Sequence, residues 1–286
     1  MKVAILGIGL MGSAVAEGMI KAGHEVLVYN RTEEKAKAVI EKGATYVPIA
    51  ADAVKAADTS ILVFTDGGVV RNVLLTKEML SAIKGKKILN ASTTGIEEIT
   101  KFGKEIEKAE GSLAEMSIMT GPDEVRNGQG YFLLGCEEAE ETFWMKVLSG
   151  IGTPSRVGEL GAATKAETPI VFASVFSSVM TAYAGASLIK LNVPEEVAIG
   201  TVGTMIPGAE YILPNIMKRN YDQCVASTDS LIGVADAAIS TAQMIGLPIT
   251  ILEKMKKLYV TASNRGYGTK DASCIVEILL HTKENE

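Results

Sequence analysis

"KVAILGIGLMGSAVAEGMIKAG", residues 2–23, decides the fold of this chain. A short apolar run typical of a strand leads into GIGLMG, and a segment of helical composition follows and closes at a glycine. Gly7, Gly9 and Gly12 form G-x-G-x-x-G between the strand and the helix, which is the context this motif needs to bind a dinucleotide. Gly7 permits the tight turn, Gly9 lets the backbone approach the pyrophosphate, and Gly12 lets helix and strand pack closely. The helix N-terminus, with Leu10 and Met11, faces the phosphates.

The end of the second predicted strand, "HEVLVYN" (24–30), indicates which nicotinamide cofactor is bound. An NAD site usually places an acid there to bind the ribose hydroxyls, but this chain has Asn30, followed by Arg31, Thr32 and Lys35. An acid would repel a 2′-phosphate, whereas Arg31 can bind one through a two-pronged, charge-assisted contact. The pattern therefore predicts NADPH. The alternative is that Arg31 is a solvated loop residue.

Further strands and helices alternate through the first half of the chain. Strands are predicted at 59–65, 86–92 and 112–119, with a helix over 95–110 between the last two. This alternation predicts an α/β, doubly wound parallel sheet, a Rossmann domain over residues 1–158. Strand patterns then stop, so residues 159–286 are predicted to form an all-α domain that starts with a long interdomain helix. Cofactor contacts are also predicted at Thr65, Asp66, Asn90 and Ser92.

Composition excludes several classes of protein. The chain has 286 residues, a net charge of −6 and no basic stripe, so nucleic acid is not an expected partner. Its two histidines, His24 and His281, leave no plausible histidine proton donor, catalytic triad or zinc site, and no metal is expected. Three widely spaced cysteines suit reduced thiols in a cytoplasmic protein. The uncharged run 168–189 could span a bilayer by length, but its Ser, Thr and Tyr residues favour a helix buried between protein surfaces, such as a subunit interface.

The segments "GIGLMG", "YNRTEEKA" and "NASTTGIEEI", with a helical second half, together resemble the β-hydroxyacid dehydrogenase superfamily, which is 6-phosphogluconate dehydrogenase-like. That group includes 3-hydroxyisobutyrate dehydrogenases, glyoxylate/succinic semialdehyde reductases and imine reductases. "NASTTG" (90–95), which contains Thr93, and "MSIMTGP" (116–122) are most similar to the imine reductase branch. The resemblance implies an NADPH-dependent reductase of C=N bonds, with Thr93 at the active site, acting as a homodimer with interlocked helical domains.

The stretch "GAATKAETPIV" (161–171) bears on the catalytic group. Lys165 and Glu167 cannot face the same pocket from one helix, since two residues turn a helix by about 200°. In the superfamily that this chain resembles, hydroxyacid dehydrogenases carry a lysine six residues after a glycine at the start of the interdomain helix. Imine reductases commonly carry an aspartate at the same place. Six residues after Gly161 stands Glu167. A carboxylate would stabilise a cationic iminium and repel a hydroxyacid anion.

Three alternatives stay open at this point. With a two-residue shift, Lys165 is the catalytic group, and the chain is a β-hydroxyacid dehydrogenase or a small-aldehyde reductase. Glu167 can also be an ordinary residue of the first helical turn, with Thr168 as N-cap and Pro169 at the first helical position. The chain can, finally, be a dinucleotide-binding regulatory protein without catalysis. The predicted apolar substrate pocket, whose side chains can equally be helix core, is Met119, Val171, Phe172, Val175 and Phe176.

Overall fold

The computed structural model describes residues 1–202 and 209–281. Packing divides the chain into two compact units, Met1–Glu167 and Thr168–Glu286. The sequence boundary was placed after residue 158, and the division falls instead within the first turns of a long helix. Each unit has its own core and is described by itself.

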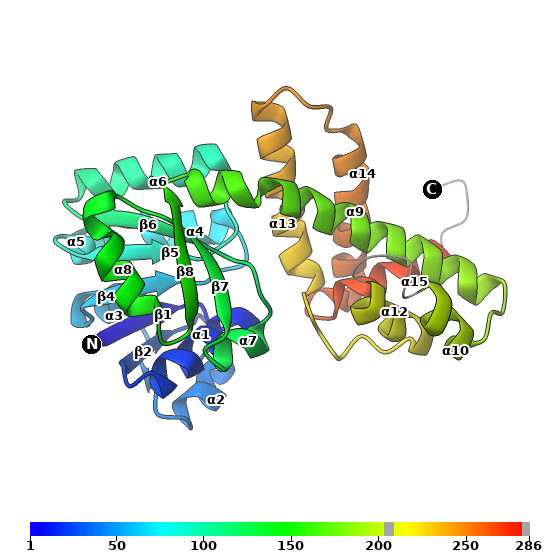
Figure 1. The fold of residues 1–286 in the computed structure, drawn as a ribbon, viewed down its shortest axis with the longest axis horizontal. Helices are drawn as coiled ribbons and strands as arrows, with labels where there is room; N and C mark the ends of the chain where they lie inside the picture. Colours follow the sequence, from blue (N-terminus) through cyan, green and yellow to red (C-terminus); the bar gives the residue numbers. More distant parts are fainter. Residues whose placement is uncertain (203–208, 282–286) are drawn as a thin grey trace. The chain divides into compact units, whose positions relative to one another are not determined.

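The first unit is built on an eight-stranded sheet in the order β3-β2-β1-β4-β5-β6-β7-β8 (Figure 1). Neighbouring strands run parallel except for β6 and β7, which are antiparallel. The order of the first six strands is that of a Rossmann sheet, so the predicted fold class is confirmed. The strands are β1 (Lys2–Leu6), β2 (Glu25–Tyr29), β3 (Thr45–Tyr46), β4 (Thr59–Leu62), β5 (Lys87–Asn90), β6 (Ser112–Ile118), β7 (Gly130–Gly135) and β8 (Gly152–Gly158).

Strand β1 shows why the sheet is buried on both faces. Val3 and Ile5 point into one core, whereas Ala4 and Leu6 point into the other, as the two-residue period of a strand requires. Helices α1, α2, α7 and α8 cover the first face, and α3 to α6 cover the second. Their bounds are α1 (Leu10–Lys21), α2 (Lys37–Ile40), α3 (Ala50–Ala56), α4 (Gly67–Leu74), α5 (Lys77–Ile83), α6 (Ile96–Lys108), α7 (Pro122–Arg126) and α8 (Glu141–Leu148).

Strands β3, β7 and β8 were not predicted, and each had a weak or unused signal. Strand β3 has two residues, too few for a pattern. Strand β7 has the sequence GYFLLG, whose aromatic and apolar residues between glycines were a usable signal. Strand β8 contains Pro154, which usually argues against a strand. It is tolerated here because β8 pairs only with β7 and lies at the sheet edge.

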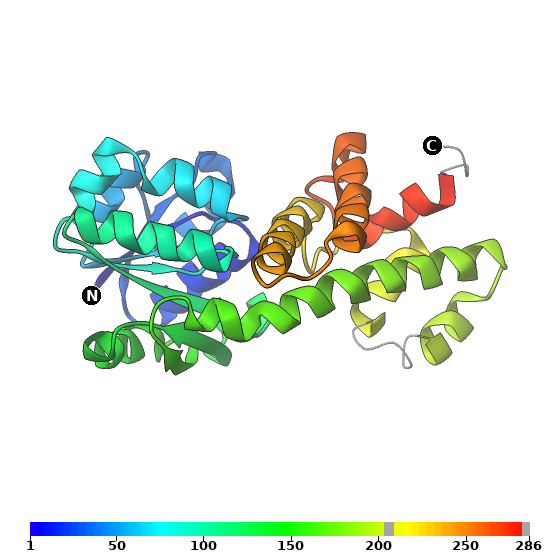
Figure 2. The ribbon, with the colours of Figure 1, turned by 90° about the horizontal axis from the view of Figure 1, so that it is seen from above.

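The second unit is helical in its described residues, as Figure 2 shows in green to red. Its helices are α9 (Ala162–Lys190, which starts in the first unit), α10 (Glu195–Val197), α12 (Ala209–Lys218), α13 (Thr228–Met244), α14 (Thr250–Ala262) and α15 (Ile275–His281). Within the predicted all-α domain, α10 is followed by a π-helical turn, Ala198–Val202. Residues 203–208 and 282–286 of that predicted domain lie outside the described residues. Helix α12, which contains Pro214, was not predicted.

Helix α9 begins at Ala162, and Pro169 therefore lies inside it. The alternative in which Thr168 caps the helix and Pro169 opens it is wrong. In the second unit, Val175, Val179 and Ala182 of α9 are buried in the core at helical spacing. Among the described residues, α9 is the one helix that is long and apolar enough to cross a membrane by length and composition. A helix in the core of a protein that lies outside membranes can have the same length and composition.

A candidate dinucleotide site and active site

The glycine loop after β1 needs its glycines for different reasons. Gly7 has a φ of +99°, and a Cβ added to it would lie 2.3 Å from the carbonyl oxygen of Val63. A Cβ on Gly12 would lie 1.9 Å from the carbonyl oxygen of Gly7, because α1 packs directly on the loop. A Cβ on Gly9 would meet no atom within 4 Å. The space at Gly9 is thus open to a ligand that approaches the backbone, as a pyrophosphate does.

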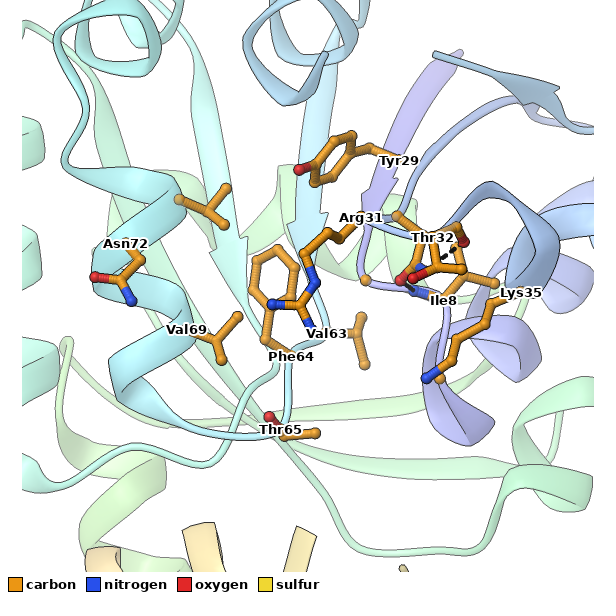
Figure 3. A pocket seen from close by; sticks show the side chains of 14 residues that line it. Ile8, Tyr29, Arg31, Thr32, Lys35, Val63, Phe64, Thr65, Val69 and Asn72 are labelled. Carbon is orange, nitrogen blue, oxygen red and sulfur yellow. Dashed lines mark hydrogen bonds between the residues drawn. The ribbon is translucent and has the colours of Figure 1, made fainter. Parts of the chain in front are cut away.

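A cavity of about 340 Å³ lies between the loops that follow β1, β2 and β4 and the helix α4 (Figure 3). It brings together seven of the predicted cofactor-binding residues: Gly7, Gly9, Asn30, Arg31, Thr32, Lys35 and Thr65. The prediction missed seven others: Ile8, Tyr29, Val63, Phe64, Val69, Asn72 and Val73. Four of these, Ile8, Tyr29, Val63 and Phe64, lay within the predicted glycine loop or at the ends of predicted strands, so the signal for them was present but not used. Those on α4 had no such signal, since that helix was not predicted.

Both charged side chains among the cavity's lining residues are cations, Arg31 and Lys35, which enter from the loop after β2 (Figure 3). Asn30 stands between the two loops. Its carboxamide oxygen accepts a hydrogen bond from the N–H of Ile8 at 3.1 Å, and its Nδ2 donates to the carbonyl of Thr32 at 2.8 Å. Asn30 therefore joins the glycine loop to the segment that carries Arg31. An open glycine backbone beside two cations fits the phosphates of a dinucleotide.

Six predicted cofactor residues do not line this cavity, and several of them shape its walls. Asp66 caps α4, accepting the N–H of Val69 at 2.9 Å. Asn90 and Ser92 are buried, and Ser92 Oγ accepts the N–H of Phe64 at 2.8 Å, which ties the turn after β5 to the loop after β4. Thr93, predicted to be catalytic, follows in the same turn and is half-buried. The six are Leu10, Met11, Gly12, Asp66, Asn90 and Ser92.

The start of α9 separates Lys165 from Glu167. Glu167 is half-buried, and its carboxylate accepts a hydrogen bond from Ser117 Oγ at 2.7 Å. Burial raises the pKa of Glu167, and the bond from Ser117 opposes part of that rise. Lys165 is exposed. Ser117 is the penultimate residue of β6, so Glu167 lies at the carboxyl edge of the sheet, the same edge as the glycine loop. Ser117 was not predicted, although it lay within the quoted segment "MSIMTGP".

The predicted substrate-pocket residues fall in both units. Met119 directly follows β6 in the first unit and is half-buried. Val171, Phe172 and Val175 belong to the core of the second unit. Phe176 lines an apolar pocket of about 530 Å³ in the second unit, between α9 and Met255 of α14. A joint substrate pocket formed by these residues stays a prediction.

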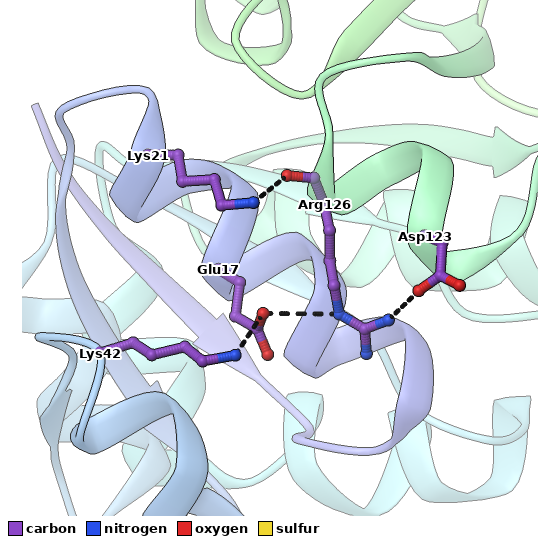
Figure 4. Close-up of polar contacts among 5 residues, drawn as sticks. All are labelled: Glu17, Lys21, Lys42, Asp123 and Arg126. Carbon is purple, nitrogen blue, oxygen red and sulfur yellow. Dashed lines mark hydrogen bonds and ion pairs between the residues drawn. The ribbon is translucent and has the colours of Figure 1, made fainter.

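An ion cluster fixes α7, the short helix that follows the Met119 loop (Figure 4). The carboxylate of Glu17, buried on α1, pairs with Lys42 at 2.7 Å and with Arg126 at 3.5 Å. Arg126 also pairs with Asp123 at 2.6 Å, and Lys21 donates to its backbone carbonyl at 3.0 Å. The cluster therefore joins α7 to the C-terminal half of α1, the helix that begins at the glycine loop.

The described residues hold no group of three or more His, Cys, Asp or Glu side chains that could bind a metal ion. The three cysteines are free: Cys136 and Cys274 are buried, and Cys224 is half-buried. Burial raises the pKa of Cys274 to about 11, so it is a protonated core thiol at neutral pH.

Residues 2–161 match the family described as the NAD binding domain of 6-phosphogluconate dehydrogenase, which is more than half of the chain. A curated relative is glyoxylate/succinic semialdehyde reductase 2, chloroplastic, of Arabidopsis thaliana. It is 23% identical over 292 residues, covering 99% of this chain and 81% of that protein.

Two solved structures share the fold. The first is 3-hydroxyisobutyrate dehydrogenase from Salmonella typhimurium, with a TM-score of 0.85 and 18% identity, covering 97% of this chain and 99% of the other. The second is an imine reductase from Myxococcus stipitatus in complex with NADP+, with a TM-score of 0.64 and 19% identity. It covers 98% of this chain and 100% of the other.

Proposed function

The chain belongs to the family that has the NAD-binding domain of 6-phosphogluconate dehydrogenase, and from that premise we propose that it is an NADPH-dependent reductase of C=N bonds. The predicted resemblance to the β-hydroxyacid dehydrogenase superfamily is confirmed, and the chain is an NAD(P)-dependent oxidoreductase. The proposal goes further in naming the phosphorylated cofactor and the imine. The observation that carries it is the carboxylate of Glu167, held at the carboxyl edge of β6 by Ser117.

Cofactor choice rests on the loop after β2. The glycine loop would hold the pyrophosphate at Gly9, where the backbone is open, and Arg31 and Lys35 would hold the 2′-phosphate. Asn30, which stands where an acid would bind a ribose diol, is already engaged with Ile8 and Thr32. A cation pair without a carboxylate favours the more highly charged cofactor.

Glu167 supplies the charge that an imine needs. When bound, the nicotinamide provides a hydride. The carboxylate of Glu167 stabilises a protonated imine nitrogen through charge and, because burial raises its pKa, it can also hold the proton that the nitrogen takes up. Ser117 keeps one carboxylate oxygen in place at 2.7 Å. A hydroxyacid anion would be repelled by the same group.

A second candidate, reduction of small aldehydes, is favoured by the exposed side chain of Lys165. An ammonium there could bind an anionic aldehyde and give a proton to its carbonyl oxygen. The Arabidopsis relative bears the name of such a reductase. Lys165 and Glu167 are about 200° apart around α9, so one substrate class cannot use both from the same pocket.

Steady-state assays with 1-pyrroline, succinic semialdehyde and glyoxylate separate these candidates. Glu167→Gln keeps shape and removes charge, so kcat for 1-pyrroline should fall by about 100-fold or more, with the affinity for NADPH nearly unchanged. Lys165→Met should be mild by comparison. If Lys165→Met abolishes turnover of the aldehydes while Glu167→Gln does not reduce any activity, the aldehyde reductase replaces our proposal. Binding of NADPH without turnover of any substrate would indicate a regulatory protein.

We also propose that the protein is a cytoplasmic homodimer. On α9, a face about 100° around the helix from the buried one exposes Phe176, Met180 and Tyr183, each more than 40% accessible. These side chains line the apolar pocket of the second unit, and such a surface is costly to leave in water. Light scattering at micromolar concentration should give twice the chain mass of 30.2 kDa. A stable monomer would refute this part.

A further inference from the structure

Glu115, in the middle of β6, is a buried carboxylate that the proposed chemistry does not use. It is 2% exposed. Its Oε1 accepts the backbone N–H groups of Ala163 at 2.9 Å and of Thr164 at 3.4 Å, and its Oε2 accepts the hydroxyl of Thr164 at 2.5 Å. The first N–H groups of a helix have no partner within the helix. Glu115 therefore caps the start of α9 from a neighbouring strand, where the helix dipole also favours a negative charge.

The fold provides room for this cap. Glu115 pairs with Gly135 across the antiparallel strands β6 and β7. A Cβ on Gly135 would lie 2.5 Å from Oε1 of Glu115, so any larger residue there would displace the carboxylate. The loop that leads into α9 ends at Gly161, which has a φ of +94°, and so turns the chain toward β6. Strands β6 and β7 and the loop that ends at Gly161 thus together surround the start of α9.

Strand β6 holds α9 at two points. Glu115 and Ser117 point to the same face of the strand, since they are two residues apart. Glu115 holds Thr164, and Ser117 holds Glu167, which is three residues further along the same helix. Three residues are nearly one turn, so the two contacts fix both the position of α9 along its axis and its rotation. A rotation by one residue, about 100°, would remove Glu167 from Ser117.

We propose that Glu115 is a positioning residue, which sets the rotation of α9 so that Glu167 rather than Lys165 faces the carboxyl edge of β6. This rests on the proposed function in one respect, the role of Glu167 as the reacting carboxylate. A cap that merely stabilised the fold would affect the melting temperature and nothing else. The two roles differ in what they do to turnover and to the environment of Glu167.

The test compares Glu115→Leu with a matched control, Glu140→Leu. Glu140 is also a buried carboxylate of the first unit, but it binds Ser112 and Trp144 at the opposite, amino-terminal edge of the sheet. Both variants should lower the melting temperature. Glu115→Leu should in addition lower kcat by about 10-fold or more, since a displacement of about 1 Å at a reacting group has effects of that size. The Kd for NADPH should stay within twofold, and Glu140→Leu should leave kcat unchanged.

Two further variants keep the test decisive if Glu115→Leu does not fold. Glu115→Gln retains an oxygen acceptor for the helix N–H groups and should restore most of kcat. Gly135→Ala keeps the side chain of Glu115 but moves its carboxylate away from the start of α9. It should therefore lower kcat, as Glu115→Leu does. Equal kcat in the wild type and in Gly135→Ala, at a lowered melting temperature, would overturn the positioning role.

A readout without turnover separates this inference from the proposed function. The Glu167 carboxyl, assigned by comparison with Glu167→Gln, can be titrated by ¹³C NMR. Its pKa should move back toward the ordinary value in Gly135→Ala, because α9 no longer holds it in the buried position, and should stay unchanged in Glu140→Leu. An unchanged pKa of Glu167 would overturn the inference. If the pKa moves but Glu167→Gln leaves kcat intact, the positioning stands and the proposed function fails.

Discussion

The loop after β2 and the start of α9 reach the same edge of the sheet in different ways. In the loop after β2, Asn30, Arg31 and Lys35 are close in sequence. The hydrogen bonds of Asn30, to Ile8 and Thr32, join residues at most 22 positions apart. At α9, Glu167 is held by Ser117, fifty residues earlier in the chain. A local motif can be recognised in the sequence. A residue that is positioned by a strand far away in the sequence can be identified only from the three-dimensional structure.

Breaking the glycine loop should produce the largest effect. Gly9 has a φ of −90°, which any residue can adopt, and it has open space around its Cα. Gly9→Val should therefore leave the melting temperature nearly unchanged while its side chain blocks the pyrophosphate. Losing two charge-assisted hydrogen bonds, each about 1.5–3 kcal/mol, predicts at least a 100-fold rise in the Kd for NADPH by calorimetry.

Gly12→Ala is the matched control for this prediction. Its Cβ would collide with the carbonyl of Gly7, so it should destabilise the free protein by about 1–3 kcal/mol in urea unfolding. If Gly9→Val destabilises the free protein as much as Gly12→Ala does, Gly9 is a packing residue and not part of a phosphate cradle.

This contrast also explains how much the sequence could predict. Alternation of strands and glycine-ended helices was sufficient to predict the Rossmann fold class and the strands β1, β2, β4, β5 and β6, because that pattern is local. Strand β7 had a usable local signal, but its antiparallel pairing with β6 and the position of β8 at the sheet edge depend on tertiary contacts that no local pattern encodes. At the site, Gly7, Gly9, Arg31 and Lys35 were predicted and gather in one cavity. Asn90 and Ser92 do not line that cavity; Asn90 donates to the carbonyl of Ser92 in its own turn and Ser92 accepts the N–H of Phe64, so their contact with the cofactor stays a prediction.

Glu115 illustrates the remaining gap. A single acid within the apolar run of β6 was visible in the sequence and signals a buried charge that needs partners. The identity of those partners was not visible, since Thr164 lies forty-nine residues away.

Arg31→Ala tests the local motif in the loop after β2, and we expect it to have the second-largest effect. Arg31 is one of two cations in the cavity. Removing its charge-assisted contact to a 2′-phosphate should raise the KM for NADPH about 10- to 100-fold, and the KM for NADH less than about twofold. Lys37→Ala is the control, because Lys37 is a nearby cation that pairs with Glu34 and does not line the cavity. Equal use of both cofactors by the wild type would contradict the assignment of NADPH.

The smallest effect concerns stability, and it examines the distant contact between Ser117 and Glu167. Burial raises the pKa of Glu167 above its value in the unfolded chain. Between those two values the folded chain binds more protons than the unfolded chain, so the free energy of unfolding falls as pH rises through the raised pKa. The contribution of Glu167 is fully present below the pKa of the unfolded state. Glu115 has a pKa raised in the same direction and contributes to the same trend.

Glu167→Gln isolates the share of this one carboxylate, because Glu115 is present in both proteins. The amide can still accept the hydrogen bond from Ser117, but it does not ionise. The stability of the variant minus that of the wild type should therefore become more positive as pH rises from about 4 to 8, in urea titrations at matched ionic strength. Ser117→Ala removes the donor that holds the pKa down, so it should shift the fall in stability to higher pH. A difference that is flat with pH would mean that Glu167 is not buried against β6, and the catalytic geometry proposed for α9 would fail with it.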